Sequence, residues 1–562
     1  MIPMDHIETV TPPSFMTLSD RLREAAQHHP YKKAIAMPSG MDKSGRTTFS
    51  HLSFGMLHRE SDAIAHKLEC AGVQKGMRAF VMLDPGPDYL SFTYALLKLG
   101  AVPVITSPGL SRKSFLECMT DAAIDVFIGS AGHHMFRLMN KSAFGNLSVP
   151  ITVGQRLFWG GHKIIIDTNE SLSPEAPEEA KEDDPALIFF TPGVTGRPKG
   201  VHYTHSSLTA LSTAIGTMLD ISPGDLHMVL HPLVVVLSPA MGVSAVMPDV
   251  DLDYLLEADM GHITDLILKQ GVTHIMASPS LLSMIGDHLA GKETVLSSLK
   301  KLIVHGTHVI PEFLTDFLPC VNENTDILLT YGAAETFPVC VLDFREMLEE
   351  TKHLSERGFG ACIGRPVREC DLVLISRSDD AISRLYQDMI LQTGDVGEIL
   401  VRGMHVSTMY VDNPKADAYA KVKDDREQIW HRTGDLAWRD KKGRLWFCGR
   451  KSQTVTTKEG PVFTISCETI FNMHPDVHRS ALVGIGTPSA QTPVMFVELD
   501  KKCSKKRKNE IHGELLELAK SNDATHPIDT ILFYDTFPVD GYHFSKILRE
   551  ELAAYAEKKL MK

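Results

Sequence analysis

Apolar and polar positions alternate in short blocks along about the first 345 residues of the chain. The apolar run 79–83 is typical of a buried strand, the mainly apolar segment 88–99 of a helix, and 101–105 of the next strand. The turn Asp84-Pro-Gly-Pro precedes the helix, and Gly100 ends it. This order of strand, helix and strand predicts an α/β sheet.

The pattern changes twice further along the chain. Beyond about residue 345, glycine turns and short strands dominate, as in 394–403, and favour a β subdomain with few helices. Beyond about residue 450, short strands and a charged C-terminal helix follow. The basic run 501–508 is interpreted as a solvated loop or helix face, with docking to an acidic partner or a membrane as the alternative.

Composition limits the class of protein. The chain has 562 residues, 43% of them hydrophobic and 23% charged, which is an ordinary balance for a globular protein of about two to four domains. Its formal net charge of −13 argues against a nucleic-acid-binding surface, which needs concentrated basic residues. The first residues carry acids and lack an apolar segment, so we expect no signal peptide.

Cysteine spacing and one uncharged stretch bear on the cellular location. The nine cysteines include no CxxC pair, so zinc and redox motifs are not indicated and a cytoplasmic location is expected. The stretch 226–248 has no Asp, Glu, Lys or Arg, but it contains Pro232, Pro239 and Pro248. Because proline interrupts a membrane helix, we expect a buried strand, loop and helix there and not an integral membrane protein.

A glycine-rich loop follows the apolar strand 186–190. It contains Gly193, Gly196 and Gly200, with Lys199 before the last of them. Glycines allow backbone N–H groups to approach phosphate oxygens closely, and lysine adds a positive charge. The Walker spacing GxxxxGK[ST] is absent. The pattern predicts a phosphate-binding loop, with a plain surface turn as the alternative.

This loop resembles the [ST]SG[ST]TGxPKG signature of the acyl-adenylate-forming enzymes, which include acyl-CoA synthetases, luciferases and adenylation domains. The matching positions are Thr191, Gly193, Thr195, Gly196, Pro198, Lys199 and Gly200. Three further motifs follow in the family's order. They are Tyr331-Gly-Ala-Ala-Glu335, similar to YGxTE, Thr433-Gly-Asp435, similar to TGD, and Gly449-Arg450, similar to the arginine motif before the hinge.

Other segments are similar to one branch of this family, the β-lactone synthetases of long-chain olefin biosynthesis. The likeness extends from about residue 15 to the C-terminus. The segments that carry it are 431–436, 443–452, 467–472, 479–484, 537–540 and 545–549.

The resemblance implies an α/β fold with two unequal parts. A large N-terminal adenylation domain of several subdomains would span residues 1–450, and a small mobile α+β domain would span 451–562. The small domain would rotate about a hinge near Ser452 and deliver Lys546 to the site in one of its states. In the family, the lysine of a C-terminal GK motif reaches the substrate carboxylate and the α-phosphate. Here Ser545 takes the place of the glycine.

The motifs also imply roles for individual residues. Glu335 would hold Mg²⁺ on the phosphates of ATP, and Asp435 would accept hydrogen bonds from the ribose hydroxyls. Lys199 would place a positive charge against the triphosphate, and Arg450 would contact the ribose or the phosphates. Lys546, Glu335 and Lys199 form the expected catalytic set. The remaining expected nucleotide contacts are Thr191, Gly193, Thr195, Gly196, Gly200, Gly306, Tyr331, Gly332 and Ala334.

The chain departs from the family's motifs at several positions. Pro192 and Val194 stand where the loop signature has hydroxyl residues, and Ala334 replaces the threonine of YGxTE that touches phosphate. Each lost charge-assisted hydrogen bond costs about 1.5–3 kcal/mol. The three changes together raise the hypothesis of a catalytically weakened member. His305 and His308 are bulkier than the residues of the family's adenine loop, unless they are ordinary surface histidines.

The resemblance to the β-lactone synthetases implies ATP- and Mg²⁺-dependent activation of a long-chain 2-alkyl-3-hydroxy acid as its acyl-adenylate, with release of pyrophosphate. The substrate's own 3-hydroxyl would then expel AMP and close a β-lactone, and its tethering would favour the attack. The run 234–237 predicts an apolar acyl pocket, or alternatively an ordinary core strand. None of the 26 histidines is singled out as a base.

Two alternatives to this hypothesis remain at the level of sequence. One is a fatty acyl-CoA or acyl-AMP ligase, and the other is a weakened family member that acts as a binding or scaffold subunit. A member of an olefin pathway would have the neighbouring reductase and β-lactone decarboxylase as partners. Acyl chain lengths, stereochemistry, the use of CoA and the oligomeric state are left open.

Overall fold

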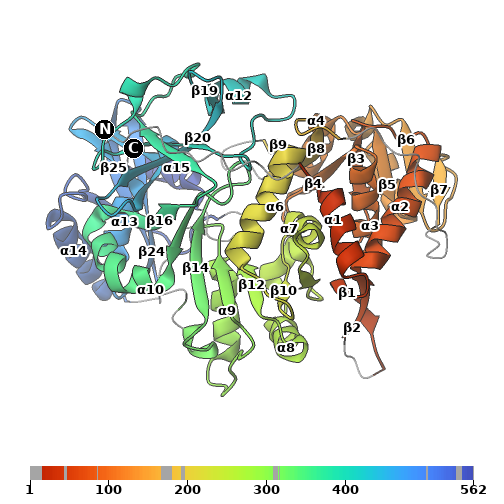
Figure 1. The fold of residues 1–562 in the computed structure, drawn as a ribbon. Helices are drawn as coiled ribbons and strands as arrows, with labels where there is room; N and C mark the ends of the chain where they lie inside the picture. Colours follow the sequence, from red (N-terminus) through yellow and green to blue (C-terminus); the bar gives the residue numbers. More distant parts are fainter. Residues whose placement is uncertain are drawn as a thin grey trace.

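The computed structural model describes most of the chain from residue 15 to residue 560. The described ranges are 15–43, 47–84, 86–165, 180–191, 197–307, 314, 317–500, 504–539 and 547–560. Figure 1 shows a broad body built on two sheets, with the C-terminal residues beside it. Across the described ranges, no helix combines the length and the apolar character that crossing a membrane requires.

The first half of the large domain is built on a seven-stranded sheet with the order β7-β6-β5-β3-β4-β8-β9. Its strands are β3 (Arg78–Met82), β4 (Val102–Thr106), β5 (Val126–Gly129), β6 (Val149–Val153), β7 (His162–Ile164), β8 (Pro185–Thr191) and β9 (Lys199–Thr204). They run parallel except for β9, which pairs antiparallel with β8. The helices of this half are α2 (Phe54–Cys70), α3 (Pro87–Lys98), α4 (Arg112–Ala122) and α5 (Ala131–Met139). The predicted strand–helix–strand order at 79–105 is confirmed by β3, α3 and β4.

The second half is built on a larger sheet with the order β17-β18-β20-β21-β16-β15-β14-β13-β12-β10-β11-β1-β2, in which β19 also pairs with β20. Its first strands are β1 (Lys33–Met41), β2 (Thr47–Ser53), β10 (Leu226–Met228), β11 (Ser244–Val246), β12 (His274–Ala277), β13 (Lys301–Val304) and β14 (Asp326–Tyr331). The others are β15 (Cys340–Asp343), β16 (Ala361–Pro366), β17 (Asp371–Ile375), β18 (Gly397–Arg402), β19 (Lys421–Lys423), β20 (Ile429–Arg439) and β21 (Leu445–Arg450). Strands β10 to β14 pair parallel with one another, whereas β14 pairs antiparallel with β15 and the pairings among β15 to β21 are antiparallel. The predicted strand-rich region after residue 345 is therefore present from β16 onward, after a helical stretch at 344–359.

Helices α1 (Leu18–His28), α6 (His205–Leu219) and α7 (Pro232–Leu237) pack between the two sheets. Helices α8 (Met260–Gln270) and α9 (Pro279–Leu289) pack against the other face of the larger sheet. Figure 1 shows α6 between the two halves, and its residues Leu208, Leu211, Ile215 and Leu219 belong to one buried cluster with residues of both sheets. The uncharged stretch 226–248 is confirmed as buried structure, but its apolar run 234–237 is helical and not a strand. Pro232 in the first turn of α7 suits the start of a helix.

A short segment before α12 (Pro414–Ala420) connects the sheets directly. The backbone N–H of Val411 donates to Gly200 O at 2.8 Å, and that of His202 donates to Met409 O at 3.3 Å. The Ser407 hydroxyl also donates to His202 O at 2.9 Å. Segment 407–411 therefore runs along β9 and holds the end of the glycine-rich loop against the second half.

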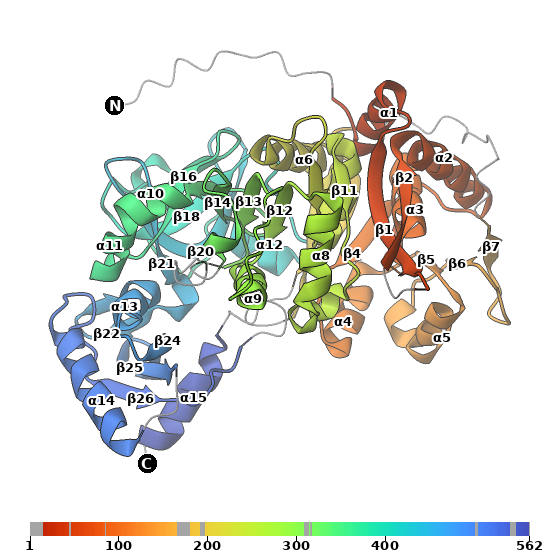
Figure 2. The same ribbon diagram turned by 90° about the horizontal axis from the view of Figure 1, so that it is seen from below.

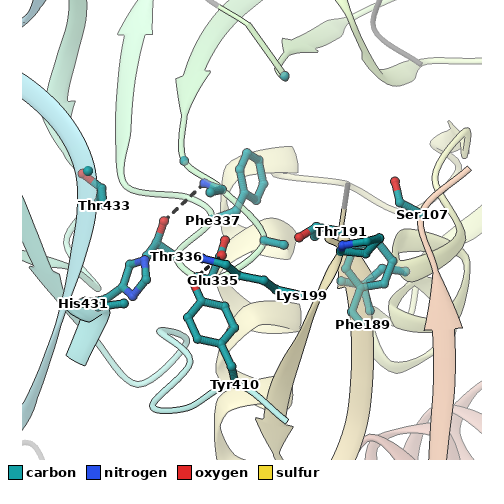
Figure 3. A pocket seen from close by; sticks show the side chains of 18 of the residues that line it. Ser107, Phe189, Thr191, Lys199, Glu335, Thr336, Phe337, Tyr410, His431 and Thr433 are labelled. Atoms are coloured by element: carbon teal, nitrogen blue, oxygen red, sulfur yellow. Dashed lines mark hydrogen bonds between the residues drawn. The ribbon is translucent and has the colours of Figure 1, made fainter. Parts of the chain in front are cut away.

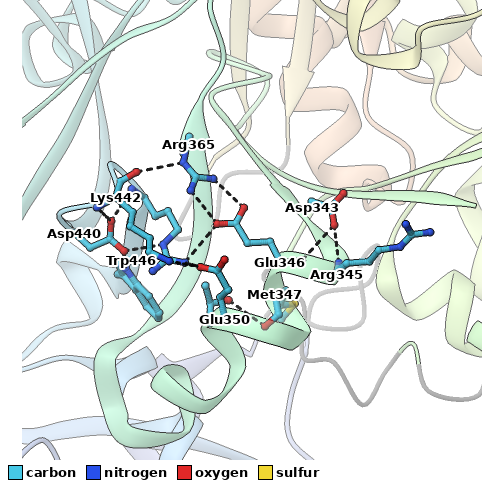
Figure 4. Close-up of polar contacts among 11 residues, drawn as sticks. Asp343, Arg345, Glu346, Met347, Glu350, Arg365, Asp440, Lys442 and Trp446 are labelled. Atoms are coloured by element: carbon cyan, nitrogen blue, oxygen red, sulfur yellow. Dashed lines mark hydrogen bonds and ion pairs between the residues drawn. The ribbon is translucent and has the colours of Figure 1, made fainter. Parts of the chain in front are cut away.

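A polar network fixes the helical stretch that follows β15 (Figure 4). Glu346 accepts two hydrogen bonds from Arg365, at 2.9 and 3.0 Å, and Glu350 accepts from Arg444 at 2.9 Å. Arg444 also donates to Asp440 at 2.7 Å. The carboxylates of the helical stretch are thus bound by arginines of β16 and of the turn between β20 and β21.

The C-terminal residues form a small α+β domain (Figure 2). Its elements are β22 (Val455–Thr457), β23 (Gly460–Val462), α13 (Thr464–Phe471), β24 (Val477–Thr487), β25 (Ala490–Leu499), α14 (Lys505–Lys520), β26 (Thr530–Phe533) and α15 (Arg549–Leu560). Part of the basic run, 505–508, forms the start of α14, where Arg507 pairs with Asp476 and Glu514 of the same domain. The exact boundary at residue 450, where β21 ends, stays a prediction.

Aromatic side chains of the large domain lie next to the small domain. The rings of Trp438 and Trp446 stack with centroids 5.6 Å apart and an interplanar angle of 11°. Trp438 Nε1 donates to Phe359 O at 2.8 Å. The preceding Gly358 has a φ of +86°, and a Cβ there would lie 2.8 Å from Ile470 Cδ1 of α13. Residues 358–359 are therefore confined between the tryptophan pair and α13.

Candidate active site

A cavity of about 1090 Å³ lies where the two sheets approach each other. Its polar end is formed by the ends of β8, β9, β14 and β21 and by residues 431–435 within β20, together with residues around Tyr410. Its apolar end is formed by side chains of α6, α7, β12 and α9. The two ends are continuous, so one site could hold a nucleotide beside an acyl chain.

At the phosphate side of the polar end, three charged or polar side chains converge (Figure 3). Tyr410 donates its hydroxyl proton to Glu335 Oε1 at 2.7 Å. The Lys199 ammonium lies 5.0 Å from the centre of the Tyr410 ring. Burial and the neighbouring Glu335 carboxylate raise the pKa of Tyr410, so its hydroxyl stays a donor. Lys199 and Glu335 are thereby brought together from opposite sheets.

A second lysine lies behind Tyr410. The Lys421 ammonium is 5.1 Å from the ring centre, and it donates to Ser407 O at 2.5 Å and to His431 Nδ1 at 2.9 Å. Burial lowers the pKa of Lys421 to about 8. Burial, together with the Lys421 and Lys199 charges, lowers the pKa of His431 well below its usual range. The cavity wall therefore holds a neutral imidazole backed by an ammonium group.

At the ribose side, Asp435 lies on β20 beside Arg450 of β21. Its Oδ2 accepts a hydrogen bond from the Tyr331 hydroxyl at 2.7 Å. Its buried Oδ1 lies 3.5 Å from Arg450 Nε and has no hydrogen-bond partner among the described residues. Burial raises the pKa of Asp435, whereas Arg450 opposes that shift. A buried acceptor left open in this way fits a ligand hydroxyl, as the expected ribose contact requires.

Below the ribose side, a buried ion-pair cluster supports β20. Glu398 accepts from Arg432 Nη2 at 2.6 Å and from Lys451 Nζ at 3.2 Å. The side chains of Glu398 and Arg432 are each 2% exposed. Both cations also donate to Ser378 O. The carboxylate therefore fixes the strand that carries Asp435 and the residue that follows Arg450.

The turn after β14 forms another wall. A Cβ on Gly332 would lie 2.9 Å from Phe337 Cα, so a larger residue would not fit there. The backbone carbonyl of Ala334 accepts a hydrogen bond from Tyr203. Gly306 lies across the cavity with a φ of +99°, and the ring of the adjacent His305 is 6.2 Å from that of Phe337. Small residues thus line a slot between Gly306 and the β14 turn.

The apolar end has few polar groups. The buried hydrophobic side chains that line it are Leu211, Ile215, Leu230, Leu233, Val234, Met276 and Leu281. His231 lies among them, with its ring 5.3 Å from that of Phe189. Of the apolar run 234–237, only Val234 reaches the cavity, and the other three residues are part of the buried core.

Most of the residues proposed from the motifs line this one cavity. They are Thr191, Lys199, Gly306, Tyr331, Gly332, Ala334, Glu335, Asp435 and Arg450. Gly200 packs behind the wall, where a Cβ would lie 2.9 Å from the Phe190 ring. Gly193, Thr195, Gly196 and Lys546 lie outside the described residues, as do Pro192, Val194 and His308. Proximity is thus shown for nine positions, and the roles assigned to them stay predictions.

Several residues of the wall were not anticipated. They include Tyr410, His431, Glu398 and His231. His431 does fall in the segment 431–436 that resembles the β-lactone synthetases, but that likeness assigns it no role. Tyr410 belongs to none of the motifs used above, so only its position in the fold identifies it.

The sequence family of the chain gives its class, an adenylating ligase. The sequence model of the AMP-binding enzyme family matches residues 22–411. The chain therefore belongs to the AMP-binding enzyme family, and it is an ATP-dependent enzyme that forms acyl-adenylates.

Two similar proteins are named olefin beta-lactone synthetase. The protein from Xanthomonas campestris pv. campestris is 33% identical over 541 residues, which cover 95% of this chain and 96% of that protein. The protein from Stenotrophomonas maltophilia is 34% identical over 554 residues, which cover 97% and 99%. The similarity therefore includes both the large and the small domain.

The fold is also found among solved structures. O-succinylbenzoate coenzyme A synthetase (MenE) from Bacillus subtilis, in complex with ATP and magnesium ion, aligns with a TM-score of 0.70 at 19% identity, covering 95% of this chain and 98% of that one. At this identity the likeness concerns the fold alone. The predicted α/β fold with a large N-terminal and a small C-terminal domain is confirmed.

Proposed function

We propose that this enzyme activates a long-chain 2-alkyl-3-hydroxy acid with ATP and closes the acyl-adenylate to a β-lactone, releasing pyrophosphate and AMP. The observation that carries the proposal is the similarity, at 33% and 34% identity over nearly the whole chain, to two proteins named olefin beta-lactone synthetase. The continuous polar and apolar ends of the cavity support it, because a nucleotide and an acyl chain need to lie side by side.

In the first step, a carboxylate oxygen of the substrate bonds to the α-phosphorus of ATP, the bond from that phosphorus to the bridging oxygen breaks, and pyrophosphate leaves with the bonding electrons. Asp435 would hold the ribose through its open Oδ1, and the charges of Lys199 and Arg450 would reduce the repulsion between the two anions. Mg²⁺, held by Glu335 and by the phosphates, would neutralise charge on the triphosphate. Such a site needs only one or two protein carboxylates, and no cluster of three metal-binding side chains occurs among the described residues. Lys546 of the small domain would complete the site.

In the second step, the 3-hydroxyl oxygen bonds to the carbonyl carbon, and the bond from that carbon to the phosphate oxygen breaks. AMP leaves with the bonding electrons, and the hydroxyl proton goes to a base. Within the described residues, the cavity wall contains three histidines, His231, His305 and His431. His231 lies at the apolar end, where the acyl chain would bind, so we assign it as the base that accepts the hydroxyl proton. The variant His231→Phe should retain pyrophosphate exchange but lose lactone release, and unchanged lactone release would exclude this role.

The direct test is an incubation with ATP, Mg²⁺ and a long-chain 2-alkyl-3-hydroxy acid in the absence of CoA. The expected products are AMP and a lactone whose mass is that of the substrate minus water. A strict requirement for CoA would contradict the proposal and indicate an acyl-CoA ligase. A simple fatty acid without the hydroxyl group is the matched substrate, and it should stop at the adenylate. Lys546→Ala should abolish product formation from either acid.

A further inference from the structure

The resemblance to the YGxTE motif implies a phosphate contact from a threonine hydroxyl at position 334, where this chain has alanine. Ala334 has no hydroxyl, and its side chain packs against the apolar core cluster that includes Tyr203. Its backbone carbonyl is already bound to the Tyr203 hydroxyl. This wall therefore offers no side-chain donor at position 334 to an anionic ligand.

His431 belongs to another wall of the same cavity, on β20. It pairs with Lys421 of β19 in the strand register, which places the two side chains next to each other. Its ring centroid lies 6.4 Å from that of Tyr410 (Figure 3), whose hydroxyl binds Glu335. The imidazole is therefore close to the side chains that would surround the phosphates.

The contact with Lys421 determines which nitrogen of His431 carries the proton. An ammonium group has donors only, so His431 Nδ1, 2.9 Å from Lys421 Nζ, must be the acceptor. In a neutral imidazole the proton then resides on Nε2. Burial and the adjacent lysine charges keep the ring neutral by lowering the pKa of His431. Because His431 lines the cavity and its Nδ1 is bound to Lys421, we infer that this Nε2–H is the donor offered to a ligand.

Lys421 does not line the cavity, so it is not placed to bind an anion there directly. Two of the three N–H donors of its ammonium go to Ser407 O and to His431 Nδ1, and the group lies beside the Tyr410 ring. Its positive charge nevertheless acts through the imidazole, because a hydrogen bond to one ring nitrogen strengthens the other as a donor. Lys199, by contrast, reaches the cavity wall directly.

We propose that His431 donates its Nε2–H to a phosphate oxygen of ATP, in place of the hydroxyl missing at position 334, and that Lys421 is the residue that positions and polarises it. The inference rests on the adenylating activity of the family and not on lactone closure. It assigns His431 to the nucleotide site and Lys421 to a supporting role behind it.

The test uses variants that separate hydrogen bonding from packing. His431→Phe keeps the ring volume but cannot donate. His431→Gln carries its amide N–H₂ about where Nε2 lies, whereas His431→Asn reaches only about as far as Nδ1. Lys421→Met keeps the aliphatic stem without the charge. Lys423→Met is the matched control, because Lys423 lies on the same strand and pairs with Glu427 on the surface.

We expect His431→Phe and His431→Asn to slow ATP–pyrophosphate exchange by about ten- to a hundredfold. The exchange rate of His431→Gln should stay within about threefold of that of the unsubstituted enzyme. The rate of Lys421→Met should be lowered as much as that of His431→Phe, and the rate of Lys423→Met should be unchanged. Calorimetry with ATP and with adenosine supplies a readout that does not need turnover. The Phe variant should lose about tenfold in affinity for ATP and none for adenosine.

Two results would overturn the proposal. One is a Gln variant as impaired as the Phe variant, which would mean that the imidazole serves packing. The other is equal loss of affinity for ATP and adenosine, which would mean that the whole nucleotide site is disturbed. If the unsubstituted enzyme shows no exchange with hydroxy acids, the substrate assignment fails, but the comparison of ATP with adenosine still decides the role of His431.

Discussion

At the polar end of the cavity, side chains from β14, β20 and β21 are joined by directional contacts, whereas at the apolar end the side chains of α6, α7 and α9 only pack. Asp435 is held on both sides, by a hydrogen bond from the Tyr331 hydroxyl and by the guanidinium group of Arg450. Leu211, Leu233 and Leu281 have no such links. We therefore expect substitutions at the polar end to disturb several joined residues, and single substitutions at the apolar end to change mainly the shape of the wall.

The largest effect is expected where the polar end depends on one buried charge. Glu398→Gln should lower the free energy of unfolding by about 3–5 kcal/mol, because it leaves the cations Arg432 and Lys451 without a buried counter-charge. Urea unfolding measures this change. Glu427→Gln, at exposed ion pairs with Lys423 and Arg384, should change the free energy of unfolding far less, because solvent screens those charges. Equal losses in the two variants would show that burial does not distinguish the pairs.

A smaller effect is expected at the ribose side. Asp435→Asn replaces one of two acceptor oxygens by a donor group, so affinity for AMP should fall by about 1.5–3 kcal/mol. Isothermal titration with AMP measures this loss, and titration with pyrophosphate, which has no ribose, is the control. An unchanged affinity for AMP would remove Asp435 from the nucleotide site and weaken the contrast between the two ends.

The smallest effect is expected at the apolar end. Val234→Phe should fill part of the wall and shift kcat/KM toward shorter acids by about 1–3 kcal/mol, while ATP affinity stays the same. Val236→Ala is the matched control on the same helix, because Val236 is buried in the core away from the cavity. It should lower stability without changing chain-length preference. A parallel change in ATP affinity in Val234→Phe would mean that the two ends are not independent.

The polar end could largely be predicted from the sequence because its residues stand in short contiguous motifs. Lys199 stands in a glycine-rich loop, and Asp435 comes directly after Thr-Gly. Each residue can therefore be recognised from its neighbours in sequence, without knowledge of the fold. The strand–helix–strand order around α3 was predictable for the same reason, because the spacing of apolar residues that indicates each element can be read within a few consecutive positions. The fold class followed from these motifs through the family resemblance.

The rest depended on contacts between distant segments. Tyr410 donates a hydrogen bond to Glu335, which lies 75 positions earlier in the sequence. None of the motifs identified in the sequence predicts that contact. Leu211, Met276 and Leu281 have the same apolar character as any core residue, so their place on a cavity wall is invisible in sequence. The run 234–237 was expected to be either a pocket or a core strand, but Pro232 begins a helix there and only Val234 reaches the cavity.

The stacked pair of Trp438 and Trp446 gives this enzyme a spectroscopic signal of its own. Two indoles 5.6 Å apart share their electronic excitation, so their near-ultraviolet circular dichroism depends on the angle between the rings. They are half of the four tryptophans in the chain, and one of them is tied to Phe359, next to the glycine that abuts α13. A displacement of α13 would relax that contact and alter the signal. We therefore expect near-ultraviolet circular dichroism to report whether the small domain moves during turnover, without attaching a label.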